Sequence, residues 1–342
     1  MKQTAVVVFP GRGAYGHKDL GKFGMHHGSR GSLIRRFDEQ RRALSQILIS
    51  ELDNSESFSE EVHTTSQNAS PLTYASSYLD YLSIDPDAFE IVAVMGNSLG
   101  WYTTLAAASA VCPTNGFKIV NTVGTLMEES GRGGQLIYPC VDTDWHVIPE
   151  EKERILDQIE QSKNIHNGFL QLSINFGGWA VLAGDEHGLE EFEKRVPSTG
   201  GFPKRLKNHS AFHSELLSHV AERAAELLDK SIFASSSVPM IDGRGHIWYP
   251  HCYENHELHD YTLSYQITNL YDFTRAIHVA ALEFSPDVFI TTGPGASLRR
   301  AIAESLIMIK WKGMNSKDDF ERADKKNRVV LHSSAVANAG DL

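Results

Sequence analysis

The chain has 342 residues, of which 41% are hydrophobic and 22% charged, the balance of an ordinary globular protein. Its formal net charge of -11 argues against general nucleic-acid binding, which relies on lysine and arginine to neutralise phosphates. The three cysteines form no C-x-x-C pair, which argues against a disulfide framework and a common zinc pattern. No apolar run is long enough to cross a bilayer. We therefore expect a reduced, cytoplasmic protein that binds neither nucleic acid nor membrane.

The first part of the chain predicts strands that alternate with helices. In chain order the pattern predicts a buried strand over residues 4–13, a loop or lid rich in Gly and His to about residue 31, a helix over 32–52, a polar surface connection over 54–70, a helix over 71–82 with proline at its first turn, a buried strand over 89–96 and a helix from residue 99. This alternation predicts an α/β fold with a mostly parallel sheet.

The pattern changes at about residue 133. The elements predicted from there are a strand at 133–141, a helix at 150–162, a strand pair at 169–185 and a helix at 187–198. This order suits a small split βαβ layer inserted into the larger domain. Helices over 214–232 and 270–284, a strand–turn–helix over 287–306 and an edge strand over 328–334 follow.

A serine between two glycines is the first candidate for chemistry. "GNSLG", residues 96–100, fits G-x-S-x-G between a predicted strand and a predicted helix, which is the context of a nucleophile elbow. Glycines on both sides let the backbone close tightly, and the following helix N-terminus offers free N–H groups to a developing oxyanion. The alternative is that Ser98 only caps the helix.

A nucleophilic serine needs a base, because a free hydroxyl is a weak nucleophile at neutral pH. Among the sixteen histidines, the stretch "NHSAFHSELLSHV" holds His209, His213 and His219. His213 lies just before an amphipathic helix, where an imidazole can be aimed, and His219 lies within that helix. His213 is therefore the candidate base.

The stretch "GHIWYPHCYENHELHD" gathers further histidines and a cysteine: His246, His251, Cys252, His256 and His259. Their spacing matches no common zinc pattern. We predict a surface loop and no metal site.

Four separated signatures, in the same order, resemble the malonyl-CoA:acyl carrier protein transacylase family and the acyltransferase domains of polyketide synthases. "VVVFPGRGAY" resembles the opening strand followed by F-P-G-Q-G, and "GNSLGWYTTLAAA" the G-H-S-L-G-E elbow. "SAFHSELL" resembles the histidine motif, and "FITTGPGASLRRAI" the closing strand with its G-P-G turn. With weaker matches between them, the resemblance covers nearly the whole chain.

The resemblance implies an α/β-hydrolase-like large subdomain, residues 1–132 and 205–342, with an inserted ferredoxin-like small subdomain, residues 133–204. It also implies an acyl-CoA:acyl carrier protein transacylase of fatty acid or polyketide biosynthesis. Such an enzyme works by a ping-pong mechanism through an acyl-serine, without a metal or other cofactor. Its partners are acyl-CoA and an acyl carrier protein, and we expect a monomer.

Carried over residue by residue, the resemblance makes Ser98 the nucleophile and His213 the base, oriented by the backbone carbonyl of Gln266. The backbone N–H groups of Arg12 and Leu99 form the oxyanion hole. The substrate-binding positions are Asn97, Trp101, Val123, Phe212 and Asn175. A basic cluster is the expected docking site for the acidic carrier protein: Lys204, Arg205 and Lys207.

Several positions depart from the family pattern. Val123 stands where malonyl transferases have the arginine that pairs with the malonyl carboxylate, so malonyl is in doubt as a substrate unless Arg12 or Arg132 supplies the charge. Asn97 replaces a histidine and Trp101 a glutamate, which changes the pocket beside Ser98. Phe212, in contrast, follows the form found in malonyl-selective polyketide acyltransferases.

The departures leave several activities open. The transferred group is malonyl with a relocated cation, an uncharged short acyl such as acetyl, or a larger acyl. An editing thioesterase would use water in place of the carrier thiol, and an inactive homologue would only bind carrier protein or CoA thioesters. A general α/β-hydrolase esterase would instead use a histidine near the C-terminus, for which His332 is available.

Overall fold

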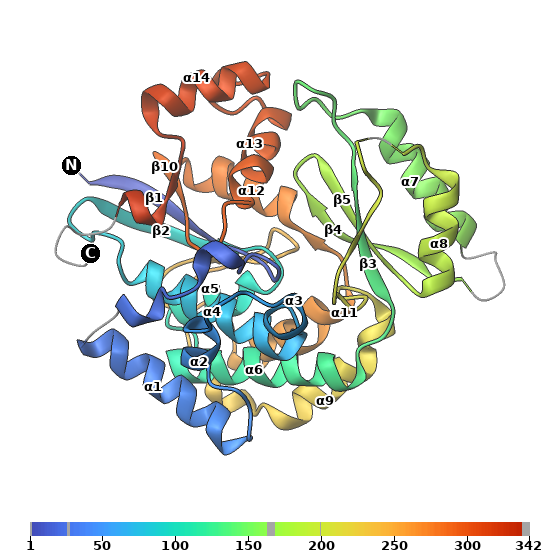
Figure 1. Cartoon of the computed structure of the whole chain (residues 1–342). Coiled ribbons are helices and arrows are strands. Elements are labelled where there is room, and N and C mark those ends of the chain that lie inside the picture. Colours follow the sequence, from blue (N-terminus) through green and yellow to red (C-terminus); the bar gives the residue numbers. More distant parts are fainter. Residues whose placement is uncertain (1, 26–27, 163–167, 199, 337–342) are drawn as a thin grey trace.

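The computed structural model describes residues 2–25, 28–162, 168–198 and 200–336, which fold around two separate β-sheets (Figure 1). The larger sheet has six strands in the order β11-β10-β1-β2-β7-β8. All neighbours pair in parallel except β7 and β8. Its strands are β1 (Gln3–Phe9), β2 (Phe89–Gly96), β7 (Met240–Ile241), β8 (Ile247–Trp248), β10 (Val288–Thr291) and β11 (Val330–His332).

Helices alternate with the strands as predicted, although the helix predicted over 32–52 is divided in two and the helices at 113–130 and 317–327 were not predicted. They are α1 (Gly28–Ala43), α2 (Ile49–Asp53), α3 (Glu60–His63), α4 (Ser66–Tyr81), α5 (Gly100–Ala107), α6 (Pro113–Ser130), α7 (Pro149–Ser162), α8 (Glu186–Arg195), α9 (Ser218–Leu227), α10 (Asn255–Asp260), α11 (Gln266–Thr268), α12 (Phe273–Phe284), α13 (Leu298–Met308) and α14 (Lys317–Asn327). Within the described ranges, no helix is both long enough and apolar enough to span a membrane.

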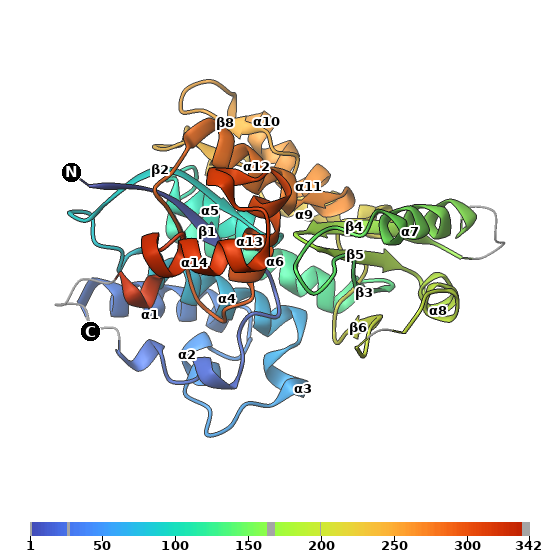
Figure 2. The same cartoon turned by 90° about the horizontal axis from the view of Figure 1, so that it is seen from above.

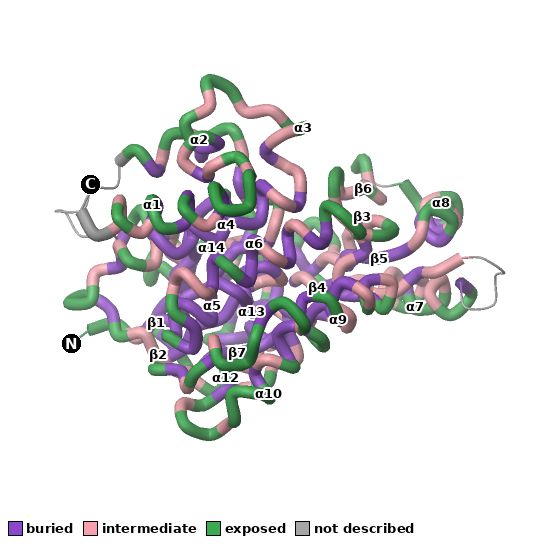
Figure 3. Tube along the Cα trace, turned by 90° about the horizontal axis from the view of Figure 1, so that it is seen from below, coloured by how far each residue is buried: buried purple, intermediate pink, exposed green. Residues whose placement is uncertain are grey.

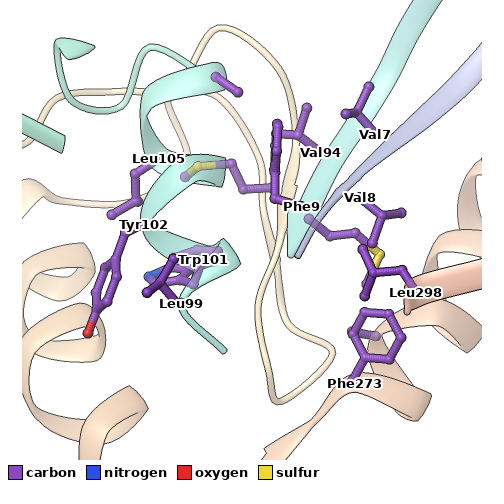
Figure 4. Packing of buried hydrophobic residues seen from close by; sticks show 14 of the residues in the cluster. Val7, Val8, Phe9, Val94, Leu99, Trp101, Tyr102, Leu105, Phe273 and Leu298 are labelled. Atoms are coloured by element: carbon purple, nitrogen blue, oxygen red, sulfur yellow. The ribbon is translucent and has the colours of Figure 1, made fainter. Parts of the chain in front are cut away.

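The large sheet lies between two helical layers (Figure 1). Helices α4, α5 and α6 cover one face, and α12 and α13 cover the other. Figure 4 shows the β1 side chains Val7, Val8 and Phe9 between α5 on one side and Phe273 and Leu298 on the other. All five are buried. A strand covered on both faces reads as a continuous apolar run, which is why β1 is recognisable from its sequence.

The smaller sheet has the order β6-β3-β5-β4-β9. Its strands are β3 (Gly134–Pro139), β4 (Leu170–Phe176), β5 (Trp179–Gly184), β6 (Lys204–Leu206) and β9 (Tyr271–Asp272). In chain order its first four strands and two helices run β3-α7-β4-β5-α8-β6, which is the split βαβ pattern of a ferredoxin-like layer. Helices α7 and α8 cover its outer face (Figure 2). The predicted fold class, an α/β-hydrolase-like part with a ferredoxin-like one, is confirmed.

The small sheet has a hydrophobic core of its own. Its buried members all lie between residues 136 and 196: Leu136, Tyr138, Cys140, Ile155, Leu170, Ala180, Leu182, Leu189, Phe192 and Val196. We propose residues 133–204 as the inserted subdomain on this basis. The sheet itself continues beyond that segment, because β6 extends to Leu206 and β9 is contributed by residues 271–272.

The segment before the second strand differs from its prediction. The polar stretch 54–70 was expected as a surface connection, but it contains α3 and the first turn of α4, and Pro71 lies inside α4. The Gly- and His-rich loop holds two short helical turns, His17–Asp19 and Phe23–Met25, while His26 and His27 lie outside the described residues. Polar composition misled the prediction because this face of α4 packs against α6 through serine and small side chains.

A buried arginine explains how α4 accommodates its proline. Pro71 has no N–H to donate to the carbonyl of Gln67, one helical turn earlier. Arg41 Nη1 donates to that carbonyl at 2.9 Å. The same fully buried guanidinium donates to Asn68 Oδ1 at 2.6 Å and to Asn121 Oδ1 at 2.8 Å. Arg41 thus joins α1, α4 and α6 through groups that would otherwise be unsatisfied.

Replacing Arg41 with leucine is expected to lower the free energy of unfolding by about 3 kcal/mol, because it removes the donor from four acceptors. These are the carbonyl oxygens of Ile47 and Gln67 and the Oδ1 atoms of Asn68 and Asn121. Denaturant unfolding followed by circular dichroism measures this. Arg42→Leu is the control, since the neighbouring Arg42 is exposed, and its effect should stay within about 0.5 kcal/mol. Equal effects of the two variants would contradict the role given to Arg41.

Candidate active site

Ser98 lies at the junction of β2 and α5, in a backbone conformation that serine rarely adopts. Its φ is 52°, in the left-handed region, and Leu99 is the N-cap of α5. A residue held in this region at a strand-to-helix turn raises its side chain away from the sheet. The geometry is that of a nucleophile elbow.

The two flanking glycines are required by close backbone contacts. A Cβ on Gly100 would lie 2.3 Å from the carbonyl oxygen of Phe9 at the end of β1. A Cβ on Gly96 would lie 2.3 Å from the carbonyl carbon of Gly100. Any larger residue at either position would force the helix away from the sheet, so the G-x-S-x-G spacing follows from packing as well as from chemistry.

Ser98, His213 and Gln266 form a hydrogen-bonded chain although they come from three distant segments. Ser98 Oγ lies 2.7 Å from His213 Nε2, and His213 Nδ1 lies 2.6 Å from the backbone oxygen of Gln266. A carbonyl oxygen can only accept, so Nδ1 carries the imidazole proton and Nε2 is left as an acceptor. The Ser98 hydroxyl therefore donates to His213, which is the arrangement a general base requires.

The environment of His213 keeps its imidazole neutral. The side chain is fully buried, and burial lowers its pKa to about 3, while the hydrogen bond to Gln266 acts in the opposite direction. No carboxylate takes part in the hydrogen bonds that join Ser98, His213 and Gln266, so the pKa of His213 is not raised by a neighbouring negative charge. A neutral imidazole is ready to accept a proton over a wide pH range.

Two backbone N–H groups are available next to Ser98. Among the described residues, neither the N–H of Leu99 nor that of Arg12 has a hydrogen-bond acceptor. Leu99 sits at the N-terminus of α5, where the helix dipole adds positive potential. Both residues line the same cavity as Ser98. This arrangement can stabilise an oxyanion formed at the Ser98 hydroxyl.

A cavity of about 550 Å³ opens at Ser98 between the two sheets. One wall is apolar and comes from α6, through Val120, Val123 and Met127. The facing wall comes from the inner face of the small sheet, through Ile137, Ile174, Phe176 and Val181. Such a chamber suits an acyl chain held next to the serine.

The side chain of Arg12 adds a cation to this apolar chamber. Its Nη1 donates to Ser66 Oγ at 2.5 Å. Within the described ranges, no carboxylate lies within 4.0 Å of this guanidinium. Burial lowers the pKa of Arg12 to about 10, an effect that the negative charge of Glu128 opposes, so Arg12 stays protonated at neutral pH.

Other predicted substrate positions fall into two groups. Asn97, Val123 and Phe212 line the cavity. Val123 is 3% exposed, and the Oδ1 atom of Asn97 is buried without a hydrogen-bond partner in the described part of the chain. Phe212 packs edge-on against the imidazole of His213, with ring centroids 4.7 Å apart.

Trp101 and Asn175 are not among the residues that line the cavity, and their contact with substrate stays a prediction. Trp101 is fully buried in the helical layer, where its indole N–H donates to Thr262 Oγ1 at 3.0 Å. Asn175 Nδ2 donates to Asp272 at 2.9 Å.

The rival residues lie elsewhere. His332 belongs to the edge strand β11, where its Nδ1 pairs with Ser334. Arg132 is exposed and is not among the cavity-lining residues. In the described part of the molecule no three histidine, cysteine or acidic side chains gather as metal ligands, the stretch 245–260 included.

The predicted basic cluster lies at the rim of the cavity but is largely paired. Arg205 forms ion pairs with Glu193 at 2.8 Å and Glu186 at 3.2 Å, and Lys207 pairs with Glu60. Lys204 is exposed. The cluster therefore offers less free positive charge than its sequence suggests.

Two residues that support the site, Tyr102 and Tyr271, were missed in the sequence. Tyr102 donates to Gln266 Oε1 at 3.0 Å, and Gln266 Nε2 in turn donates to the carbonyl of Ser98 at 3.2 Å. Tyr271 donates to the carbonyl of Gly96 at 2.6 Å. Only the position of Tyr102, one helical turn after Ser98, was a usable signal.

Comparisons with known proteins agree with the geometry. No protein-family model matches the chain. The malonyl CoA-acyl carrier protein transacylase of Bacillus subtilis is 27% identical over 214 residues, a match that spans 60% of this chain and 63% of the length of that relative.

Solved structures share the fold across nearly the whole chain. An acyl carrier protein S-malonyltransferase from Vibrio cholerae has a TM-score of 0.72 at 17% identity, covering 99% of this chain and 98% of its own. A malonyl-transacylase solved in complex with its type II polyketide synthase acyl-carrier protein has a TM-score of 0.70 at 18% identity, covering 95% and 100%. The resemblance seen in the sequence is thereby confirmed: this chain has the fold of the malonyl-CoA:acyl carrier protein transacylases and is similar in sequence to one of them.

Proposed function

We propose that the protein is an acyltransferase that moves an acyl group from acyl-CoA to the pantetheine thiol of an acyl carrier protein, through an acyl-Ser98 intermediate. The observation that carries this proposal is the chain from Ser98 Oγ to His213 and on to the backbone oxygen of Gln266. The similarity to a malonyl CoA-acyl carrier protein transacylase supports the choice of substrates. A solved neighbour bound to its acyl-carrier protein supports the choice of acceptor.

In the first half-reaction Ser98 Oγ attacks the thioester carbonyl while its proton passes to His213 Nε2. The N–H groups of Arg12 and Leu99 hold the oxygen as it gains negative charge. The carbon–sulfur bond then breaks, and CoA leaves as the thiol with the proton from His213. In the second half the carrier thiol gives its proton to His213 and attacks the acyl-serine, and Ser98 recovers the proton on release.

The acyl group is proposed to be malonyl or a similar acyl that ends in a carboxylate. The resemblance expects an arginine at position 123, where an apolar valine lines the cavity. Arg12 lines the same cavity, stays charged, and has no carboxylate within 4.0 Å among the described residues. A partly buried cation without an anion is costly, and a substrate carboxylate would remove that cost.

We further propose that the reaction takes place in the cytoplasm, in fatty acid or polyketide biosynthesis, with the chain as a monomer. The three cysteines are free thiols. The chemistry needs only a nucleophile, a base and oxyanion donors, so the proposal includes no metal or other cofactor.

Incubation with a panel of acyl-CoAs is expected to add one acyl mass to Ser98, measured by intact-protein and peptide mass spectrometry. Ser98→Ala should remove the adduct, and His213→Ala should slow its formation at least about 1000-fold, because the hydroxyl loses its base. His332→Ala should leave acylation unchanged. Release of the acyl group by water at the rate seen with carrier protein would instead indicate a thioesterase, and binding without any adduct an inactive homologue.

The acylation rate is expected to stay nearly constant from pH 8 to pH 5. His213 is active when unprotonated, and a pKa of about 3 keeps it so throughout this interval. A base with an ordinary pKa of about 6.5 would lose about 30-fold by pH 5. Rapid-quench measurement of acyl-Ser98 at each pH, with circular dichroism as a check on folding, separates the two cases.

Replacing Arg12 with glutamine is expected to lower kcat/KM for malonyl-CoA about 100-fold, the loss of about 3 kcal/mol of ion pairing. Acetyl-CoA should react as before, because the backbone N–H at position 12 remains. The double variant Arg12→Gln/Val123→Arg should recover malonyl transfer by returning a cation to the cavity at position 123. An equal loss for both acyl-CoAs would contradict the carboxylate role and point to damage to the oxyanion site.

A further inference from the structure

The rim of the cavity is closed on one side by two contacts between α3 and the end of β6. Lys207 Nζ forms an ion pair with Glu60 Oε2, and Asn208 Nδ2 donates to Thr64 Oγ1 at 2.6 Å. Glu60, Thr64 and Lys207 all line the cavity that leads to Ser98. Helix α3 belongs to the large sheet's part of the chain and β6 to the small sheet (Figures 2 and 3), so these contacts bridge the entrance.

The ion pair at the rim is weak and exposed. The side chains of Lys207 and Glu60 are 69% and 60% exposed. Pairs in such positions stabilise a fold little, because water and salt screen them. The contact can therefore open without cost to the fold, and an anion of higher charge can replace the carboxylate.

Lys207 differs from Arg205 in the position of its ion-pair partner. Arg205 is held by Glu193 and Glu186, both on α8 of its own subdomain. The ion-pair partner of Lys207, Glu60, lies across the entrance on α3. Loss of that partner would leave Lys207 free at the mouth of the cavity.

We propose that Lys207 exchanges Glu60 for a phosphate of the thioester substrate as the substrate enters. The proposal rests on the acyl-transfer function above. Both thioesters of that reaction carry phosphate at the far end of a pantetheine arm, as a pyrophosphate in CoA and as a phosphodiester in the carrier protein. When the acyl carbon lies at Ser98, the arm must leave through the mouth of the cavity, where Lys207 stands.

In the free protein the Glu60 carboxylate then lies next to Lys207, where the substrate phosphate would bind. A phosphate group offers more negative charge and more acceptor oxygens than a carboxylate, and lysine binds it readily. Glu60 competes with the substrate for Lys207 and at the same time holds the lysine at the entrance. Removing the lysine and removing the glutamate should therefore have opposite effects on substrate binding.

The test compares Lys207→Gln with Glu60→Gln in acylation of Ser98. Lys207→Gln should raise KM for acyl-CoA about fivefold at unchanged kcat, and Glu60→Gln should lower it about twofold. Acyl-pantetheine, which has no phosphate, should show neither change. In the transfer step, a KM effect with holo-carrier protein as acceptor would assign the carrier phosphodiester as a second ligand, and an effect confined to CoA would assign the CoA phosphates alone.

Lys194→Gln is the matched control, because Lys194 is also an exposed, ion-paired lysine of the small subdomain but lies on α8. It should leave every KM unchanged. Asn208→Ala opens the other contact at the rim without changing charge. The proposal is overturned if Glu60→Gln, Lys207→Gln and Asn208→Ala all shift KM in the same direction, acyl-pantetheine included, since the rim contacts would then only hold the entrance in shape. Failure of the wild type to form acyl-Ser98 from any thioester would instead overturn the acyl-transfer function.

Discussion

The proposed chemistry of the site depends on the hydrogen bond from His213 Nδ1 to the backbone oxygen of Gln266. Because a carbonyl oxygen has no proton to give, this bond places the imidazole proton on Nδ1 and leaves Nε2 to accept from Ser98. It also depends on the fold around it, since Gln266 begins α11 and its side chain is held by Tyr102 and by the carbonyl of Ser98. One residue therefore positions both the base and the nucleophile.

A neutral acceptor in place of a carboxylate has an electrostatic consequence. In the proposed reaction the imidazolium has no anion beside it, so the fully buried His213 would return its proton readily to the leaving group. The surroundings are arranged accordingly, with apolar side chains from α6 on one wall and from the small sheet on the other. Arg12 adds a positive charge beside these apolar walls, and the proposed choice of acyl group rests on that charge.

The candidate active site takes its residues from both the large and the small sheet. Ser98 and the proposed oxyanion donors follow β1 and β2, the central strands of the large sheet, while one wall of the cavity and part of its rim come from the small sheet. The two parts are also joined by β9, which follows α11 and pairs with β4. Both walls belong to one hydrophobic core, which contains Val120, Val123 and Met127 of α6 together with Ile174 and Val181 of the small sheet. The contact between Glu60 and Lys207 is exposed and lies outside this core, so it can change without disturbing the core.

The sequence by itself determined the alternation of strands and helices, the split βαβ order of the small layer, the edge strand at residues 330–332, and the candidacy of Ser98 and His213. These features are local: a buried parallel strand must be apolar throughout, and a tight strand-to-helix turn must have glycine where a Cβ would meet backbone. Order along the chain was also enough to recognise the similarity to transacylases.

Only the tertiary structure decided what depends on distance between remote segments. It separated Arg12, which lies in the cavity, from Arg132, which does not, and it moved Trp101 into the core. It turned the polar stretch before Pro71 into helix, because Arg41 from α1 satisfies the carbonyl that the proline leaves free. It also paired Lys207 with Glu60. Side-chain partners of this kind are set by packing between elements far apart in the chain. The residue pattern of a single element therefore cannot predict them.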